Sequence, residues 1–425
     1  MIGKIDKEFG SDNSTNQRSI HWPSVWQMGF SIISITILWV ISLVIVIMTI
    51  GNGLGFIESG MSWERLQLIL MATGIFFVGV LLLPSGGYAL LHLLRKPNPI
   101  NIKLPQSSWL FLSITILLSI GFFMSADSKS SWLFLPPLHV LTLGLSALWV
   151  ISLAVRHLPI GSKQRVWGIF SVGLVIAPLT SLIAELVTLI TLGVVGISFL
   201  AQDPEFLTLL NQFNENYLSN PNLPINTMIE YFQPYILNPI IVAIITITIT
   251  ILVPLIEELF KPIGVWLLVG SKTTPSMGFA AGVLSGIGFA LFENFMFSAT
   301  SSSDWSLVVL GRIGTNFIHA LTAGITGWAL TLAWQKKKYF QLGFTYLASV
   351  CIHGLWNGFA VLSVLPEFLP RGTIYPEILG KIIVLSPVGL AVLLIGCFFL
   401  LRKFNSLLRH AIMSPVANDN KPPAG

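Results

Sequence analysis

One short stretch of the sequence, V-P-L-I-E-E-L-F-K-P at 253–262, places two carboxylates and a lysine inside an apolar run. A charge near the centre of a bilayer costs about 2.5–3.5 kcal/mol on insertion scales, so spanning helices rarely carry one without a function. Three later apolar segments each carry one more carboxylate or imidazole, namely Glu293, His319 and His353. Carboxylates and imidazoles act as general acids and bases or bind zinc. We therefore expect these residues to form one polar site, in a shared water-filled pocket within the membrane.

The spacing within E-E-L-F-K predicts separate roles for its two glutamates. Glu257 and Lys261 are four apart with the acid first, which is the favourable order for a helical ion pair. Glu258 is rotated by about 100° from its neighbour and is expected to face the pocket. Pro254 and Pro262 each remove a helical donor and are expected to kink the helix here. The alternative is a salt bridge that only locks the bundle.

The other candidates lie on the following helices. Arg312 and His319 are seven apart and so share a face, where Arg312 could support the site by pairing with Glu293. His353 and Asn357 are four apart and could present two donors to one point, as an oxyanion hole requires. The alternatives are histidines with purely structural roles and a polar clamp between helices.

The composition indicates which elements must position these residues. The 425 residues are 54% hydrophobic and 10% charged, whereas soluble proteins carry about 25% charged residues. The sequence therefore predicts an all-α, polytopic transmembrane bundle of about ten spanning helices. The apolar runs are 29–51, 67–94, 109–124, 132–155, 166–198, 239–270, 277–300, 305–334, 339–363 and 379–401.

Basic residues fall on every second loop between these runs, and the intervening loops are polar or acidic. Lys and Arg prefer the cytoplasmic side, so both termini are predicted to be cytoplasmic. The net charge of +5 arises from these loops and does not indicate nucleic-acid binding. The two cysteines, Cys351 and Cys397, both lie in apolar runs and provide neither a disulfide framework nor a thiol metal site.

These features divide the chain into five parts, and no internal repeat is visible. We expect a cytoplasmic arm at 1–28, accessory transmembrane helices at 29–198, an external loop at 199–238, a catalytic transmembrane core at 239–401 and a disordered cytoplasmic tail at 402–425. The external loop is expected to contain short helices lying on the membrane. In the accessory part, His92, His139 and Glu185 have no partners at matching spacing and are expected to be structural.

The ordered motifs E-E-x-x-K, F-x-x-x-E, a histidine helix and H-x-x-x-N resemble those of the PrsW family of bacterial intramembrane proteases. That family is similar to the type II CAAX prenyl endopeptidases, in which a histidine stands where this chain has Glu293. The resemblance covers about 239–363. Glu257 and Glu258 match the paired glutamates, Glu293 ends the second motif, and His319, His353 and Asn357 match the third and fourth.

The resemblance implies an integral protein of the bacterial cytoplasmic membrane that cleaves membrane proteins. Single-span proteins, such as an anti-sigma factor cut at its external side, are the substrates it implies.

Two mechanisms of peptide hydrolysis fit these residues. In the one we favour, Glu258 is the general base, Glu293 and His319 orient the water, and His353 with Asn357 stabilises the oxyanion, without a cofactor. In the other, Glu258, Glu293, His319 and His353 hold zinc. A rival from another class is a proton-coupled secondary transporter that uses the same Glu and His side chains. A further alternative is a non-catalytic member that binds a membrane partner.

Overall fold

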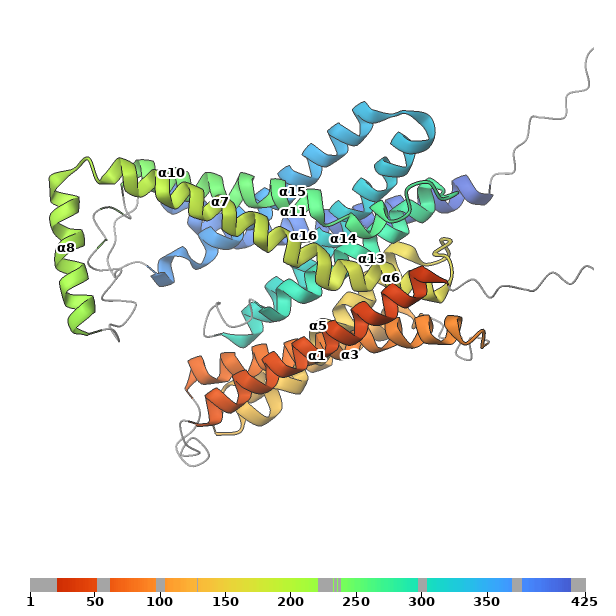
Figure 1. The fold of residues 1–425 in the computed structure, drawn as a ribbon, viewed down its shortest axis with the longest axis horizontal. Helices are drawn as coiled ribbons and strands as arrows, with labels where there is room; N and C mark the ends of the chain where they lie inside the picture. Colours follow the sequence, from red (N-terminus) through yellow and green to blue (C-terminus); the bar gives the residue numbers. More distant parts are fainter. Residues whose placement is uncertain are drawn as a thin grey trace, which may run out of the picture.

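The computed structural model describes residues 21–51, 62–96, 104–127, 129–220, 232, 235, 238–296, 304–368 and 377–413. Within these residues the regular structure is entirely helical, and ten helices are long and apolar enough to cross a membrane. The predicted all-α transmembrane bundle is therefore confirmed, and each of the ten spans overlaps one predicted apolar run. Figure 1 shows the spans running lengthwise through the molecule and crossing one another at an angle.

The first five spans come from the accessory part. They are α1 (Trp22–Gly51), α3 (Trp63–Leu93), α4 (Ser107–Ser125), α5 (Ser131–Val155), and a continuous series of α6 (Lys163–Ser171), the π-helical turn η1 (Val172–Ile176) and α7 (Ala177–Leu200). Beyond α7, α8 (Pro204–Ser219) lies across the ends of α7 and α10 in Figure 1. The predicted external loop thus contains a helix, and most of the rest of that loop lies outside the described residues.

The second five spans begin with a broken helix. It consists of α10 (Pro239–Ile247), the π-helical turn η2 (Thr248–Leu252), α11 (Val253–Phe260) and the short α12 (Ile263–Trp266). Four further helices follow, namely α13 (Pro275–Met296), α14 (Trp305–Lys336), α15 (Tyr339–Phe368) and α16 (Glu377–Met413). The interruption falls beside the two prolines, as their missing donors predict.

The centre of the bundle is the pair α13 and α14, which is buried along most of its length. The small residues of α13 allow this close packing. A Cβ atom at Gly282 would overlap the backbone of Ala323, and one at Gly286 would overlap the backbone carbonyl of His319. The glycine face of α13 therefore sets the position of a candidate site residue.

Two predicted boundaries are wrong because helices continue past the apolar segment. The first helix begins at Trp22 rather than at 29, and α16 continues to Met413 rather than ending at 401. Asn405, in this polar extension, donates to the carbonyls of Ala154 and Arg156 at 2.8 and 3.0 Å. The length of an apolar run indicates the part of a helix that lies in lipid. The backbone hydrogen bonds of a helix can continue beyond the lipid.

The start of α1 and the end of α16 lie at the same end of the bundle in Figure 1. An even number of spans requires this arrangement. That this end faces the cytoplasm stays a prediction from the loop charges.

Candidate active site

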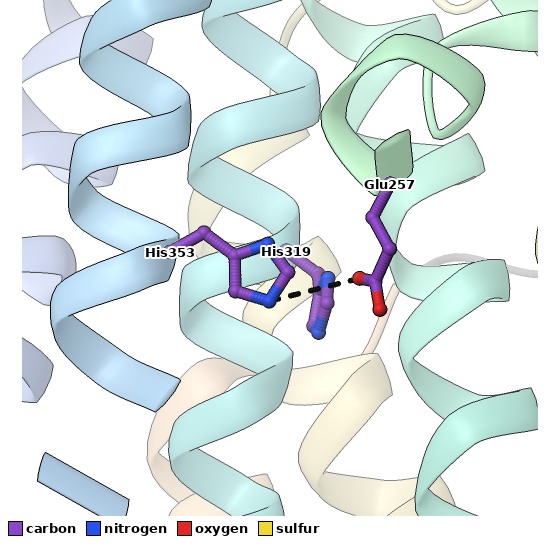
Figure 2. Close-up of side chains that lie close together, drawn as sticks. All are labelled: Glu257, His319 and His353. Carbon is purple, nitrogen blue, oxygen red and sulfur yellow. Dashed lines mark ion pairs between the residues drawn. The ribbon is translucent and has the colours of Figure 1, made fainter. Parts of the chain in front are cut away.

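Four helices bring the predicted acids and imidazoles together. Glu257 and Glu258 come from α11, Glu293 from α13, His319 from α14 and His353 from α15. His319 Nε2 lies 2.9 Å from Glu293 Oε2. His353 Nδ1 lies 2.9 Å from Glu258 Oε1, and its Nε2 lies 3.6 Å from Glu257 Oε2 (Figure 2). The two imidazole rings are 5.1 Å apart between centroids, so the predicted convergence of these side chains is found.

Lys261 joins this group and contacts both glutamates of α11. Its Nζ lies 2.6 Å from Glu258 Oε1 but 3.6 Å from Glu257 Oε2, and 3.4 Å from His353 Nδ1. The predicted ion pair between Lys261 and Glu257 is therefore found. The expectation that Glu258 has no part in this pairing is wrong, because Lys261 lies closer to Glu258. Positions i+3 and i+4 share one helical face, so the spacing alone does not select the partner. The polar cluster consists of Glu257, Glu258, Lys261, Glu293, His319 and His353.

The polar cluster is packed within the bundle rather than openly hydrated. Glu258 and Lys261 are fully buried, while the side chains of Glu257 and Glu293 keep 11% and 20% of their surface exposed. Glu258 Oε1 also accepts a hydrogen bond from Thr322 Oγ1 at 3.2 Å. Among the three carboxylates of the cluster, Glu257 and Glu293 are therefore the two that keep accessible surface.

Residues of α15 contact the backbone at the point where the sixth span is broken. Pro254 has no N–H, so neither an α-helical nor a π-helical bond from it can reach the carbonyls of Thr250 and Ile249. Asn357 Nδ2 donates to the Ile249 carbonyl at 3.3 Å, and Gly354 lets α15 approach the Thr250 carbonyl. The Asn357 amide thus satisfies a backbone carbonyl left free by the break, as the alternative of a polar clamp between helices requires, and its role as an oxyanion donor stays a prediction.

On the α13–α14 side, Arg312 donates to Glu293 Oε1 at 3.3 Å, so the predicted support of Glu293 by Arg312 is found. An amide network lies behind this pair. Asn294 Nδ2 donates to the Arg312 carbonyl and to Asn316 Oδ1, at 3.2 and 3.1 Å, and Asn316 Nδ2 donates to Ser146 Oγ at 2.8 Å. Sequence reasoning missed these amides. The feature of the sequence that could have indicated this network is the position of Asn294, directly after Glu293.

Glu185 on α7 also belongs to the surroundings of the cluster. Its side chain is half-buried in the bundle. α7 packs against α11, the helix that carries Glu257 and Glu258, and the structural role expected of Glu185 stays a prediction. His139 instead packs between the rings of Phe295 and Trp305, consistent with its expected structural role.

Three residues of the polar cluster fit the requirements of a metal site. Glu257, His319 and His353 each offer a ligand atom, and these atoms lie within 4.8 Å of one another. Glu257 Oε2 and His319 Nδ1 are buried and make no hydrogen bond. Two imidazoles and one carboxylate are an ordinary donor set for catalytic zinc. This set differs from the predicted one, because Glu258 and Glu293 instead contact one nitrogen of each imidazole.

Comparison with known proteins finds one family. Residues 223–393 match the family model described as PrsW family intramembrane metalloprotease. No curated protein and no solved structure matches the chain. The match includes all six residues of the polar cluster, and it supports intramembrane proteolysis as the activity. Residues 223–393 are therefore similar to the PrsW family of intramembrane metalloproteases, the family that the motifs predicted.

Proposed function

We propose that this protein hydrolyses peptide bonds of membrane proteins with a zinc ion held by Glu257, His319 and His353. The observation that carries this proposal is the pairing of the imidazoles. Each has one nitrogen against a carboxylate, His319 Nε2 against Glu293 and His353 Nδ1 against Glu258, both at 2.9 Å. Zinc-binding histidines commonly use this carboxylate contact to fix the ring and its tautomer. His319 Nδ1 and His353 Nε2 then remain as ligands.

The other residues of the cluster act on these ligands. Glu258 and Glu293 orient the imidazoles, and Lys261 offsets the charge of the two glutamates on α11. Asn357 is a positioning residue, because its bond to Ile249 holds the broken helix that carries Glu257 and Glu258. When bound, zinc would supply Lewis-acid chemistry that activates water and polarises the peptide carbonyl.

A mechanism without a cofactor would use a general base other than the predicted Glu258. Glu258 is fully buried and bonded to Lys261 and Thr322, so it has no free approach to water. Glu257 Oε2 makes no hydrogen bond and its side chain is partly exposed. Without a metal, Glu257 would therefore take the proton from water. Activity before and after treatment with a strong chelator, beside a metal assay of the pure protein, separates the two mechanisms.

The direct test is Glu257→Ala in the full chain, with cleavage of a co-expressed single-span membrane protein as the readout. Loss of cleavage is expected. Glu377→Ala is the matched control, because this exposed glutamate on α16 also pairs with a lysine four residues on. Equal cleavage by wild type and Glu257→Ala would reject the assignment.

The substrate class is part of the proposal. We propose single-span proteins of the bacterial cytoplasmic membrane, such as an anti-sigma factor cut at its external side. The parts of the chain keep their proposed roles, with 239–401 as catalytic core and 29–198 as supporting helices. Comparative membrane proteomics of wild type against Glu257→Ala tests the substrate class, since the true substrate accumulates uncut only in the variant.

A further inference from the structure

A cavity of about 770 Å³ lies apart from the polar cluster, where the accessory part meets the core. Its wall comes from the start of α1, the end of α3, the first turns of α6 and η1, and the segment after α12. No residue of the polar cluster lines it. The volume falls within the range of small-molecule binding sites, about 300–1,000 Å³.

The lining is polar where the helices begin and apolar deeper along them. His21 precedes α1, and Trp26 and Phe30 follow one and two turns later. On the fifth span, Arg165 lies in the first turn of α6, and Ile176 lies 11 residues further, about 16 Å along the axis. Both helices start odd-numbered spans, so their polar starts lie at the same end of the bundle, which is predicted to be cytoplasmic.

A hydrogen-bond network fixes the polar part of the cavity. Ser24 Oγ lies 2.8 Å from His21 Nδ1 and 3.0 Å from His92 Nδ1, and it accepts from Gln164 Nε2 at 2.6 Å. A hydroxyl has one proton, so Ser24 can donate to only one of the two imidazoles. That imidazole accepts at Nδ1 and therefore carries its own proton on Nε2 when neutral.

The cavity is thus supplied with donors and positive charge. Arg165 is one of its lining residues, together with His21, His92, Ser162 and Ser271, and no carboxylate-bearing residue lines it. Arginine binds phosphate oxygens in a bidentate manner. The cytoplasmic leaflet is the one rich in anionic lipid.

We propose that this cavity binds an anionic phospholipid, with its phosphodiester at Arg165 and the histidine pair and an acyl chain along Trp26, Phe30 and Ile176. The apolar wall distinguishes this ligand from free phosphate, which would leave most of the volume without contacts. Leu267 and Leu268, also in the lining, directly follow α12, the last helix of the broken span that carries Glu257. The lipid therefore stabilises the packing of the accessory helices on the broken sixth span. The proposal does not depend on the proposed proteolysis.

The test measures binding to the full chain in detergent, by thermal shift and native mass spectrometry. The probes are phosphatidylglycerol, phosphatidylcholine with the same acyl chains, and inorganic phosphate. Phosphatidylglycerol is expected to stabilise the wild type, and Arg165→Gln to weaken its binding by about tenfold, as expected when a charge-assisted hydrogen bond is lost. Lys163→Gln is the matched control, because this neighbouring cation on α6 does not line the cavity.

A second variant keeps the test decisive if Arg165→Gln does not fold. Ile176→Trp fills the apolar part and leaves every polar group in place, so it is expected to weaken phosphatidylglycerol binding as well. Equal stabilisation by phosphatidylcholine or by inorganic phosphate would overturn the proposal. So would equal losses in Lys163→Gln and Arg165→Gln, or no binding of phosphatidylglycerol at all.

Discussion

At the residue scale, Lys261 is the side chain on which the polar cluster depends. It is fully buried and lies within 3.6 Å of two carboxylates that would otherwise carry uncompensated charge. A buried charge is tolerated only when it is paired and hydrogen-bonded. Lysine meets this need for both glutamates at once because its ammonium group has three donors.

Replacing Lys261 with Met keeps the length of the side chain and removes its charge. We expect a loss of about 3–5 kcal/mol in the free energy of unfolding, the cost of breaking a buried ion pair from one side. Lys381→Met is the control, since Lys381 also lies 2.6 Å from a glutamate oxygen but is 70% exposed. That exposed pair is worth about 0–1 kcal/mol. Chemical denaturation in detergent gives both values, and equal losses would contradict the account.

The contacts between imidazoles and carboxylates give a second prediction at this scale. Glu258→Gln retains a hydrogen-bonding group beside His353 but removes the carboxylate. We expect zinc affinity to fall by about 10–100-fold, as when outer-shell partners of metal ligands are changed. Competition with a chromophoric chelator measures the affinity, with Glu377→Gln as the control. A wild-type protein that binds no zinc under these conditions would rule out the metal mechanism and leave Glu257 as the base.

At the scale of elements, glycines set how closely the helices that carry the cluster approach. Gly286 faces the His319 backbone, and Gly354 faces the carbonyl of Thr250 in η2. The first contact holds α14 against α13, and the second holds α15 against the broken span. Each helix that supplies an imidazole is therefore positioned by a glycine at the point where it passes its neighbour.

Gly286→Ala is expected to push α14 away from α13 and to separate His319 from Glu293. Overpacking of this kind costs about 1–3 kcal/mol, and the displaced imidazole should lower cleavage more than stability alone explains. Gly396→Ala on α16 is the control, because a Cβ there meets nothing within 4 Å. The control should be neutral or slightly stabilising. Thermal stability and cleavage in the same membranes measure both effects, and an active, stable Gly286→Ala would disprove the packing argument.

The spans could be read from the sequence because crossing a bilayer requires about 20 apolar residues, a constraint that acts on composition directly. The convergence of Glu293, His319 and His353 followed from the cost of placing such groups in lipid. The ion pair between Lys261 and Glu258, and the hydrogen bond from Asn357 to Ile249, could not be predicted in this way. These contacts depend on the rotation of one helix against another and on a backbone break, neither of which residue spacing specifies.

At the scale of the whole molecule, the accessory half forms part of the scaffold of the core. Trp305 at the start of α14 is buried against Gly121 of α4, and Asn316 on α14 bonds to Ser146 of α5. Gly173 in η1 packs on the backbone of Ser285 in α13. The family match does not extend to these accessory helices, yet they support the helices that hold Glu293 and His319.

The orientation of this assembly in the membrane is the last prediction. The loop charges place the ends of α1 and α16 in the cytoplasm, which puts α8 on the opposite, external side. In a variant lacking Cys351 and Cys397, we introduce Ser219→Cys on α8 or Ser406→Cys on α16, both at exposed positions. A membrane-impermeant maleimide should label Ser219→Cys in intact cells and Ser406→Cys only after permeabilisation. The reverse pattern would invert the topology, and it would move the proposed lipid site to the external leaflet.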